Sequence, residues 1–335
     1  MQRNPAYDLL RITAIFAVVW LHVSAVAVVP DASLTRPGWL TADLLAAFSR
    51  WSVPAFVLLS GALLLDRPIH NDPLAFYRKR FKRILLPLLF WTVFYIVWIF
   101  LNQRSIDFTP LWRPILEGRA YYHLWFIYMV AGLYLAAPWL SWLLAKLRPA
   151  WQPWLAAFIL AASLLEIILR RSANGQELLF PFLWLPFTGY FILGHWLAKH
   201  EPRYTAPVYA AAFLLGCLST ASGAAWFLAR GLQWGLVFEY FSPTVIFAAL
   251  AAFRWCQCLK PEQLQGHAAR LARLSDLTFG VYLIHPIFLD LFLKFGLLPG
   301  DAPLTLIPLL SAAVFALALG LSLVLSAHPR LKQLI

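Results

Sequence analysis

Long apolar segments recur along the whole chain and are separated by short polar stretches. A segment of about 20 residues is long enough for an α-helix to cross the hydrocarbon core of a bilayer. The apolar segments cover residues 7–29, 40–64, 84–101, 122–144, 152–170, 182–198, 206–228, 236–256, 275–297 and 303–327. Because backbone exposed to lipid must satisfy its own hydrogen bonds, the pattern predicts an all-α, polytopic membrane protein, a bundle of about ten transmembrane helices.

The polar stretches between these segments are too short to fold on their own. The two longest, 65–83 and 102–121, have about 20 residues each, far fewer than a domain. We therefore predict a single transmembrane domain over residues 1–335, with no extramembrane domain.

Composition agrees with a membrane protein. Hydrophobic residues make up 61% of the chain and charged residues 13%, and a mean hydropathy of +0.71 is too high for a soluble protein. The 16 Trp and 12 Tyr residues suit aromatic belts at two membrane surfaces. The 3 cysteines do not form a disulfide framework, and Cys256 and Cys258 lack the further ligands of a zinc site, so we predict structural cysteines and no metal.

The net charge of +12 would raise nucleic acid as a partner if the chain were soluble. Here the basic residues lie mostly between apolar segments, which favours membrane orientation or a phosphate-bearing ligand over nucleic acid. The stretches on the side of the N-terminus hold most of the Lys and Arg residues, with the densest group at 78–83. By the positive-inside rule, we predict that both termini are cytoplasmic.

The first apolar segment carries three ionisable residues, Asp8, Arg11 and His22, which are costly inside a bilayer. At about 100° per residue, Arg11 and His22 lie about 20° apart around the helix, and Asp8 lies about 60° from Arg11. All three therefore share one stripe, which should point away from lipid, and His22 lies roughly 16 Å above Arg11. A signal peptide is the alternative, but the long apolar run and its charges fit a cleaved segment poorly.

Arg50 lies in the second apolar segment, about ten residues from its outer end and thus near mid-depth. An arginine at that depth needs a carboxylate, an anionic ligand or water beside it. A structural ion pair with Asp43 is one interpretation, and a role in a functional site is the one that we favour. Pro54 follows one turn later and can kink this helix.

A basic cluster precedes the third segment and consists of Arg78, Lys79, Arg80, Lys82 and Arg83. Such clusters are ordinary topology signals or contacts with anionic lipid. The alternative is a docking site for a phosphorylated cofactor, because Arg80 and Arg83 are one helical turn apart and can bind the same group. Composition alone favours the first interpretation.

The ninth segment contains Tyr282 and His285, which are three residues apart and share a helix face. His285 lies roughly 15 Å deep, within about two helical turns of His22 in depth. Pro286 frees a backbone carbonyl one turn earlier, which provides a further hydrogen-bond acceptor. A single histidine in a bundle is usually a packing group, but two at similar depth, together with Arg50, indicate a site.

Aromatic residues surround His123 at the start of the fourth segment, over residues 121–128. The predicted topology places this stretch at the outer surface. Taken alone, the stretch is typical of an interfacial aromatic belt.

Five motifs occur in order along the chain: Asp8-Leu-Leu-Arg11 with His22, Ser52-Val-Pro-Ala-Phe-Val-Leu-Leu-Ser-Gly61, Arg80-Phe-Lys-Arg83, His123-Leu-Trp-Phe126 and Tyr282-Leu-Ile-His-Pro286. Together they resemble the acyltransferase 3 family, the integral-membrane enzymes that acylate bacterial surface carbohydrates. Each motif alone is weak, but the set in this order is fairly specific. Within the family, the chain is most similar to the stand-alone O-acetyltransferases of the enterobacterial common antigen type.

The resemblance implies acetyl-CoA as acyl donor, a hydroxyl of a cell-surface or lipid-linked glycan as acceptor, and a place in the bacterial inner membrane. It assigns catalysis to His22, Arg11 and Asp8, since a histidine can take the proton of the attacking hydroxyl or carry the acyl group itself. It also favours the cofactor interpretation of the basic cluster.

The remaining assignments follow from the same resemblance. The coenzyme phosphates would be bound by Arg80, Arg83, Arg78 and Lys82. The acceptor would be bound by Arg50, His285, Tyr282, His123 and Trp125.

Two other functions fit the buried charges. In a transporter or flippase for a lipid-linked sugar, the same residues would relay protons or bind the substrate, although no inverted repeat is visible in the sequence. The bundle could instead present acyl groups to a separate transferase. Binding of acetyl-CoA to the purified protein separates an acyltransferase from a transporter.

Overall fold

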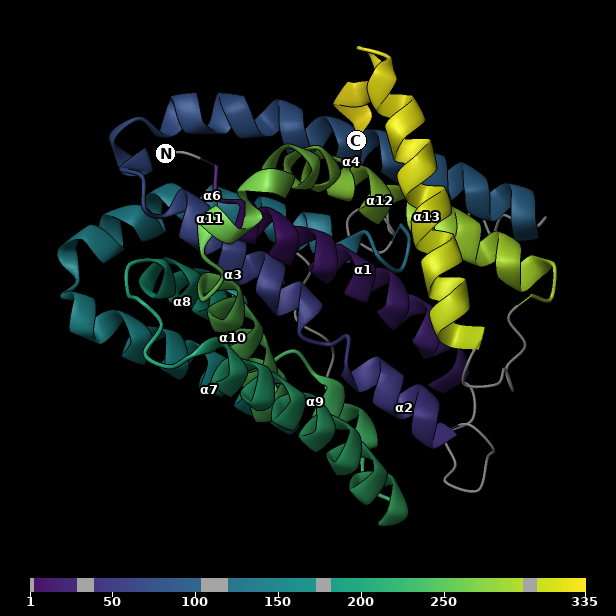
Figure 1. Ribbon diagram of the computed structural model, residues 1–335, viewed down its shortest axis with the longest axis horizontal. Coiled ribbons are helices and arrows are strands. Elements are labelled where there is room, and N and C mark those ends of the chain that lie inside the picture. Colours follow the sequence, from purple (N-terminus) through teal and green to yellow (C-terminus); the bar gives the residue numbers. More distant parts are fainter. Residues whose placement is uncertain (1–2, 29–38, 104–119, 173–181, 298–305) are drawn as a thin grey trace. The chain divides into compact units, whose positions relative to one another are not determined.

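The fold is helical wherever the computed structural model describes the chain, over residues 3–28, 39–103, 120–172, 182–297 and 306–335 (Figure 1). These residues contain no strand. The longer helices are α1 (Pro5–Val28), α2 (Trp39–Ala47), α3 (Ser52–Leu64), α4 (Pro73–Gln103), α6 (Trp125–Lys146), α7 (Gln152–Ser172), α8 (Thr188–Ala198), α9 (Ala206–Ala229), α10 (Pro243–Gln257), α12 (Ala268–Lys294) and α13 (Leu306–Ala327). Short helices are α11 (Pro261–Leu264), η1 (Ile69–Asn71), η2 (Pro149–Trp151), η4 (Trp234–Phe238), η5 (Gln265–His267) and η6 (Leu331–Leu334).

Nine helical segments within the described residues are long and apolar enough to cross a membrane. This confirms the predicted all-α polytopic fold. The predicted span at 182–198 is not among these nine segments. The helix α8 within it has only 11 residues, which would cover about 16 Å of a hydrocarbon core of about 30 Å. The sides on which the termini lie stay a prediction.

The second predicted span is two helices rather than one. Residues 48–51 form turns between α2 and α3, and Arg50 lies in this break. The Ser49 hydroxyl donates to the Ala46 carbonyl oxygen at 2.7 Å, and the Ser52 hydroxyl donates to the Ser49 carbonyl oxygen at 2.6 Å. Pro54 falls in the first turn of α3, where a missing N–H costs nothing, so it begins a helix instead of kinking one.

The described chain divides into two compact units. The first comprises Met1–Leu59 and Leu197–Val324, and the second comprises Ser60–Trp196 and Leu325–Ile335. The division cuts through three continuous helices, α3, α8 and α13. The single-domain prediction is not tested by this division and stays a prediction.

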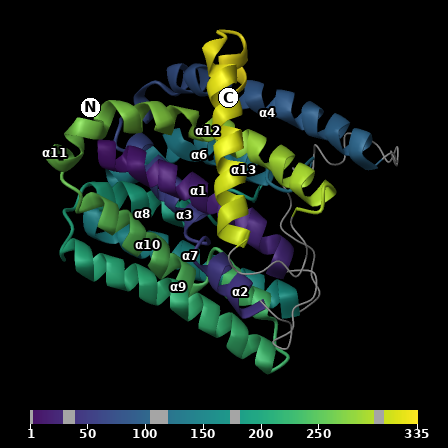
Figure 2. The same ribbon diagram turned by 45° about the vertical axis from the view of Figure 1, so that its right-hand side comes forward.

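In the first unit, α1 packs against α12, α2 and α10. On its polar stripe, Asp8 is buried, whereas Arg11 and His22 are partly exposed. The helices α9 and α10 run side by side (Figures 1 and 2). They approach closely because Gly216 has no side chain, and a Cβ at that position would lie only 2.9 Å from the Cβ of Ala248. Small residues permit such contacts where the hydrophobic effect does not drive association.

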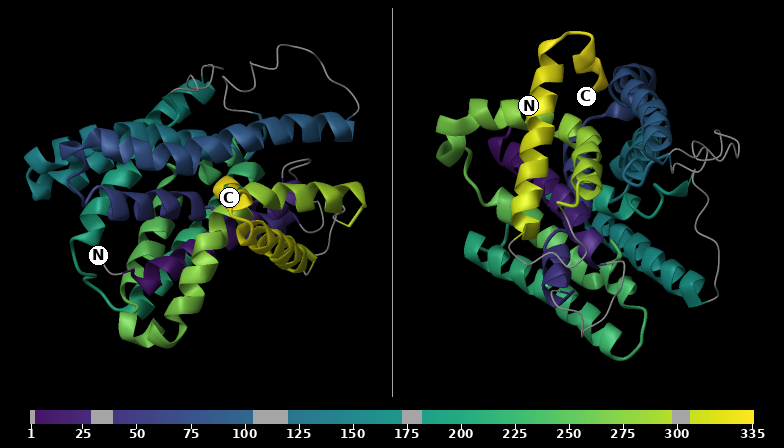
Figure 3. Two further views of the ribbon diagram at one scale, coloured as in Figure 1. Left: turned by 90° about the horizontal axis from the view of Figure 1, so that it is seen from above. Right: turned by 90° about the vertical axis from the view of Figure 1, so that its right-hand side faces the viewer.

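In the second unit, α6 packs against α4 and η1, and α4 continues as one long helix (blue in Figure 3). The C-terminal η6 packs against α4, where the indole N–H of Trp91 donates to the Leu334 carbonyl oxygen at 2.8 Å. The Trp184 side chain occupies the space that a side chain at Gly132 would need. These contacts position the basic cluster at the start of α4.

Candidate active site

Two histidines from segments far apart in the sequence meet in the first unit. The imidazole rings of His22 on α1 and His285 on α12 are stacked, with ring centroids 5.2 Å apart and an interplanar angle of 27°. The side chain of His285 is 0% exposed. Helical depth predicted that the two would lie at similar height, and the structure adds that the faces of the two helices bring them into direct contact.

The ring of His285 is held in one orientation by its own helix. Its Nδ1 atom lies 2.7 Å from the Tyr282 carbonyl oxygen and 3.2 Å from the Val281 carbonyl oxygen. Carbonyl oxygens only accept hydrogen bonds, so Nδ1 carries the proton and donates it. In the neutral ring, Nε2 therefore carries the lone pair, and it lies on the side of the ring turned away from the α12 backbone.

The sequence Tyr282-Leu-Ile-His-Pro286 explains this orientation. The Tyr282 carbonyl would normally accept a hydrogen bond from the N–H four residues later, but Pro286 has none. The sequence predicted this freed carbonyl, and the structure shows that His285 uses it. The Tyr282 backbone thus accepts from His285, while its ring lies with its centroid 6.4 Å from that of Phe279 and 6.2 Å from that of His285. Its role in acceptor binding stays a prediction.

Arg50 contacts Phe238 and Tyr240, and its place in one cavity with the two histidines stays a prediction. The charge of its guanidinium is close enough to act on His22 and, by a hydrogen bond, on the Tyr240 side chain. Its Cζ atom lies 4.9 Å from the centre of the Phe238 ring. The alternative interpretation is wrong, because Arg50 and Asp43, both in the described part of the chain, form no ion pair.

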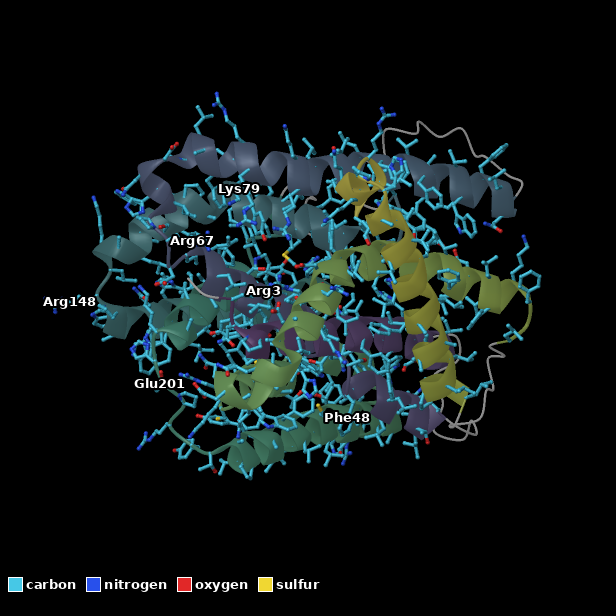
Figure 4. The ribbon with its side chains drawn as sticks, turned by 45° about the horizontal axis from the view of Figure 1, so that its top comes forward. Arg3, Phe48, Arg67, Lys79, Arg148 and Glu201 are labelled. Carbon is cyan, nitrogen blue, oxygen red and sulfur yellow. The ribbon has the colours of Figure 1, made fainter. Side chains whose placement is uncertain are left out.

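Asp8 and Arg11 belong to a separate ion-pair network at the start of α1. Asp8 is buried and its Oδ2 accepts a hydrogen bond from Arg3 Nε at 2.7 Å. Arg11 Nη1 lies 3.4 Å from Asp8 Oδ1 and donates to Ser275 Oγ at 2.7 Å. Arg3, which Figure 4 labels, also donates to Asp276 Oδ1 on α12 at 2.9 Å.

This network joins α1 to α12 about 16 Å along the axis from His22. The carboxylates of Asp8 and Asp276 raise the pKa of Arg3, so that side chain stays charged. Sequence reasoning counted Arg3 only as a topology signal and missed Ser275 and Asp276. The geometry gives Asp8 and Arg11 a positioning function for α1; their catalytic assignment stays a prediction.

The basic cluster of the second unit is helical, because α4 begins at Pro73. Arg80 is partly buried, with its Cζ atom 5.7 Å from the Phe76 ring centre and 5.4 Å from the Tyr134 ring centre. The positive charges of Arg83 and Arg67 act on Arg80. No pattern in the sequence indicates that Arg67 belongs to this cluster, because it follows α3 and lies thirteen positions before Arg80. Figure 4 labels Arg67 and Lys79. The other predicted members, Arg78 and Lys82, are exposed.

His123 and Trp125 are part of a packed aromatic cluster in the second unit. His123 is buried, and its ring meets that of Tyr95 edge-on with centroids 4.9 Å apart. Tyr95 also stacks on Tyr121 at 4.3 Å. Trp125 packs against Phe187 at 5.9 Å. His123 thus packs inside the unit. Its place at a membrane surface and its role in acceptor binding both stay predictions.

The described residues contain no group of three or more His, Cys, Asp or Glu side chains that could hold a metal ion. Cys217, Cys256 and Cys258 are not disulfide-bonded. The Cys256 thiol donates to the Ala6 carbonyl oxygen at 2.9 Å and so joins α10 to α1, which fits the predicted structural function.

A family model described as an acyltransferase domain matches residues 4–327, nearly the whole chain. Over 291 residues, the chain is 22% identical to the protein named "Putative membrane-bound acyltransferase YfiQ" of Bacillus subtilis (strain 168), and the match covers 84% of this chain and 80% of that relative. No solved structure matches the chain. The family match includes both the histidine pair and the basic cluster.

Proposed function

This chain belongs to the acyltransferase 3 family and is a multi-pass membrane acyltransferase, and we propose that it transfers an acetyl group from acetyl-CoA to a hydroxyl group of a cell-surface or lipid-linked glycan. The observation that carries the proposal is the contact between His22 and the fully buried His285, with the charge of Arg50 acting on His22. Acyl transfer to a hydroxyl needs a base for its proton and positive charge for the developing oxyanion, and this group supplies both.

In the proposed reaction, His22 takes the proton of the acceptor hydroxyl while the hydroxyl oxygen attacks the thioester carbon. A C–O bond forms, the C–S bond breaks, and the proton passes from His22 to the departing thiolate. The products are the acylated glycan and free CoA. Arg50 supplies fixed positive charge for the oxyanion. In an alternative order of steps, His22 first takes the acyl group itself and then passes it to the hydroxyl.

In the proposed reaction, His285 binds the acceptor. Because its Nδ1–H is bound to backbone carbonyls, only the Nε2 lone pair is directed away from α12. An Nε2 lone pair accepts a hydrogen bond from a hydroxyl group. His285 would thus orient the attacking sugar hydroxyl, which is the binding role that the family resemblance assigns to it.

We assign the phosphates of acetyl-CoA to the basic cluster of the second unit, formed by Arg67, Arg78, Arg80, Lys82 and Arg83. Arginines bind phosphate oxygens through charge-assisted, often bidentate hydrogen bonds. The rings of Phe76 and Tyr134 hold the Arg80 side chain in place, so less side-chain entropy is lost on binding. The donor, the acetyl group and the inner-membrane location all rest on the resemblance to the family.

Two measurements test the proposal together. Purified protein should bind acetyl-CoA, as measured by calorimetry, and mass spectrometry of surface glycans should find acetyl groups that are missing from cells lacking the protein. His22→Ala, produced at the wild-type level, should leave acetyl-CoA binding intact and remove the glycan acetyl groups. Movement of an unmodified lipid-linked sugar without consumption of acetyl-CoA would support the transporter instead.

A further inference from the structure

Asp43 on α2 is a buried carboxylate that this reaction does not use. Its side chain is 1% exposed, and Oδ1 has no hydrogen-bond partner among the described residues. Burying a carboxyl group without a partner is strongly unfavourable. Ionisable residues inside membrane segments are therefore expected to meet a ligand, a counter-ion or water.

Trp39 provides the complementary group one turn earlier on the same helix. It is also 1% exposed, and its indole Nε1, a donor, has no partner in the described part of the chain. Residues four apart lie on one face of a helix, so Trp39 and Asp43 point to the same side of α2. The Trp39 ring meets the ring of Trp234 on η4 edge-on, with centroids 5.9 Å apart. This face of α2 thus combines an unsatisfied donor, an unsatisfied acceptor and an aromatic wall.

We propose that Trp39, Asp43 and Trp234 form a subsite for a hydroxyl group of the glycan acceptor, an assignment that rests on the proposed glycan acyltransferase function. A hydroxyl satisfies both unmet groups at once, because its oxygen accepts from the indole N–H and its proton is donated to the carboxylate. The apolar C–H face of a sugar ring packs well against indole rings. Pockets that bind small ligands have this composition, largely aromatic with a few polar groups.

The subsite recognises a hydroxyl other than the one that is acylated. Along η4, Trp234 contacts Trp39, and Phe238, four residues later, contacts Arg50. Four residues of 3-10 helix rise about 8 Å, about the length of one or two sugar rings. The charge of Arg50 in turn acts on His22. One end of the α2–η4 contact is therefore linked through Arg50 to the histidine pair, and the other end holds the proposed subsite.

Asp43→Leu and Trp39→Phe test the subsite, because each removes one hydrogen-bonding group and retains an apolar side chain. In cells, the ratio of acetylated to unacetylated surface glycan measures acceptor use; calorimetry with acetyl-CoA on the purified full-length variants measures donor binding and folding together. We expect each substitution to lower the acetylated fraction about tenfold or more while the acetyl-CoA affinity stays within twofold of wild type. Ser311→Ala is the matched control, since it removes a buried hydroxyl that already has a partner, the Ile307 carbonyl oxygen.

If Asp43→Leu does not fold, Asp43→Asn tests the subsite instead, because the amide keeps the shape of the Asp43 side chain and one acceptor oxygen. It should reduce acetylation less than Asp43→Leu would, by about threefold to tenfold. Wild-type acetylation in both Asp43→Asn and Trp39→Phe would overturn the subsite and indicate that a water molecule satisfies the two groups. Failure of the wild-type protein to bind acetyl-CoA or to acetylate any glycan would instead refute the proposed function, and the subsite with it.

Discussion

Replacing Pro286 by alanine should make the protein more stable and less active. Alanine restores an N–H that can donate to the Tyr282 carbonyl, the acceptor that His285 Nδ1 now uses at 2.7 Å. A proline inside a helix costs about 3 kcal/mol relative to alanine. One hydrogen bond is worth a net of about 0.5–1.5 kcal/mol, so loss of the His285 bond offsets only part of this gain. We expect the unfolding free energy to rise by about 2 kcal/mol.

The effect on activity follows from the same hydrogen bond. Losing about 0.5–1.5 kcal/mol lowers the population of the correct His285 orientation about twofold to twelvefold. Glycan acetylation in cells at matched protein levels should fall by this factor, whereas acetyl-CoA binding stays unchanged. Thermal unfolding of the purified protein, followed by tryptophan fluorescence, measures the stability.

Pro138→Ala is the matched control for this experiment. Pro138 is also buried inside a helix, α6, which carries neither histidine. Its replacement should raise the unfolding temperature and leave acetylation at the wild-type level. Full activity in Pro286→Ala, or a fall in activity equal to that in Pro138→Ala, would refute the reasoning that backbone acceptors orient His285.

Four further substitutions separate chemistry, donor binding and helix positioning. His22→Ala should lower transfer roughly 10²–10⁴-fold at wild-type expression, measured by glycan mass spectrometry, and near-normal activity would remove His22 from the reaction. Arg80→Ala and Arg83→Ala should each raise the acetyl-CoA dissociation constant at least several-fold, since a charge-assisted hydrogen bond contributes about 1.5–3 kcal/mol. An unchanged dissociation constant would indicate that the basic cluster is only a topology signal. Arg3→Ala should lower the unfolding free energy by only about 1 kcal/mol, because Arg3 is partly exposed and its charge is screened, and should leave acetyl-CoA affinity unchanged. A lower acetyl-CoA affinity in Arg3→Ala would show that the network does more than join α1 to α12.

Hydropathy and helix geometry predict the long helices and the heights of their polar residues. The rise per residue placed His22 and His285 at similar depth, which their ring contact requires. The hydrogen-bond acceptor freed by Pro286 could also be read from the sequence, because a missing N–H is a property of the residue itself. These features depend on local chemistry or on counting along one helix.

Features that depend on contacts between distant segments could not be predicted in this way. The partners of Asp8 include Arg3, which also binds Asp276, and no periodicity connects residues 3 and 276. The break at 48–51 lies inside a long apolar segment, although the hydroxyls of Ser49 and Ser52 are a local signal for it. Likewise, Pro186 precedes α8 and indicated that the helix in this predicted span starts late.

Because α8 is short, the number of membrane crossings depends on whether the chain also crosses the bilayer at this helix. Nine crossings would leave the two termini on opposite sides, whereas the predicted cytoplasmic location of both termini requires an even number. On the predicted topology, α8 therefore forms only part of a further passage through the bilayer. In residues 182–187 this passage consists of turns whose N–H groups bond to carbonyls three residues earlier, as between Leu185 and Phe182 at 3.0 Å. Non-helical backbone at membrane depth must be enclosed by protein, but Phe182 and Leu185 in these turns are 46% and 43% exposed, so the predicted even number of crossings requires further cover for this stretch.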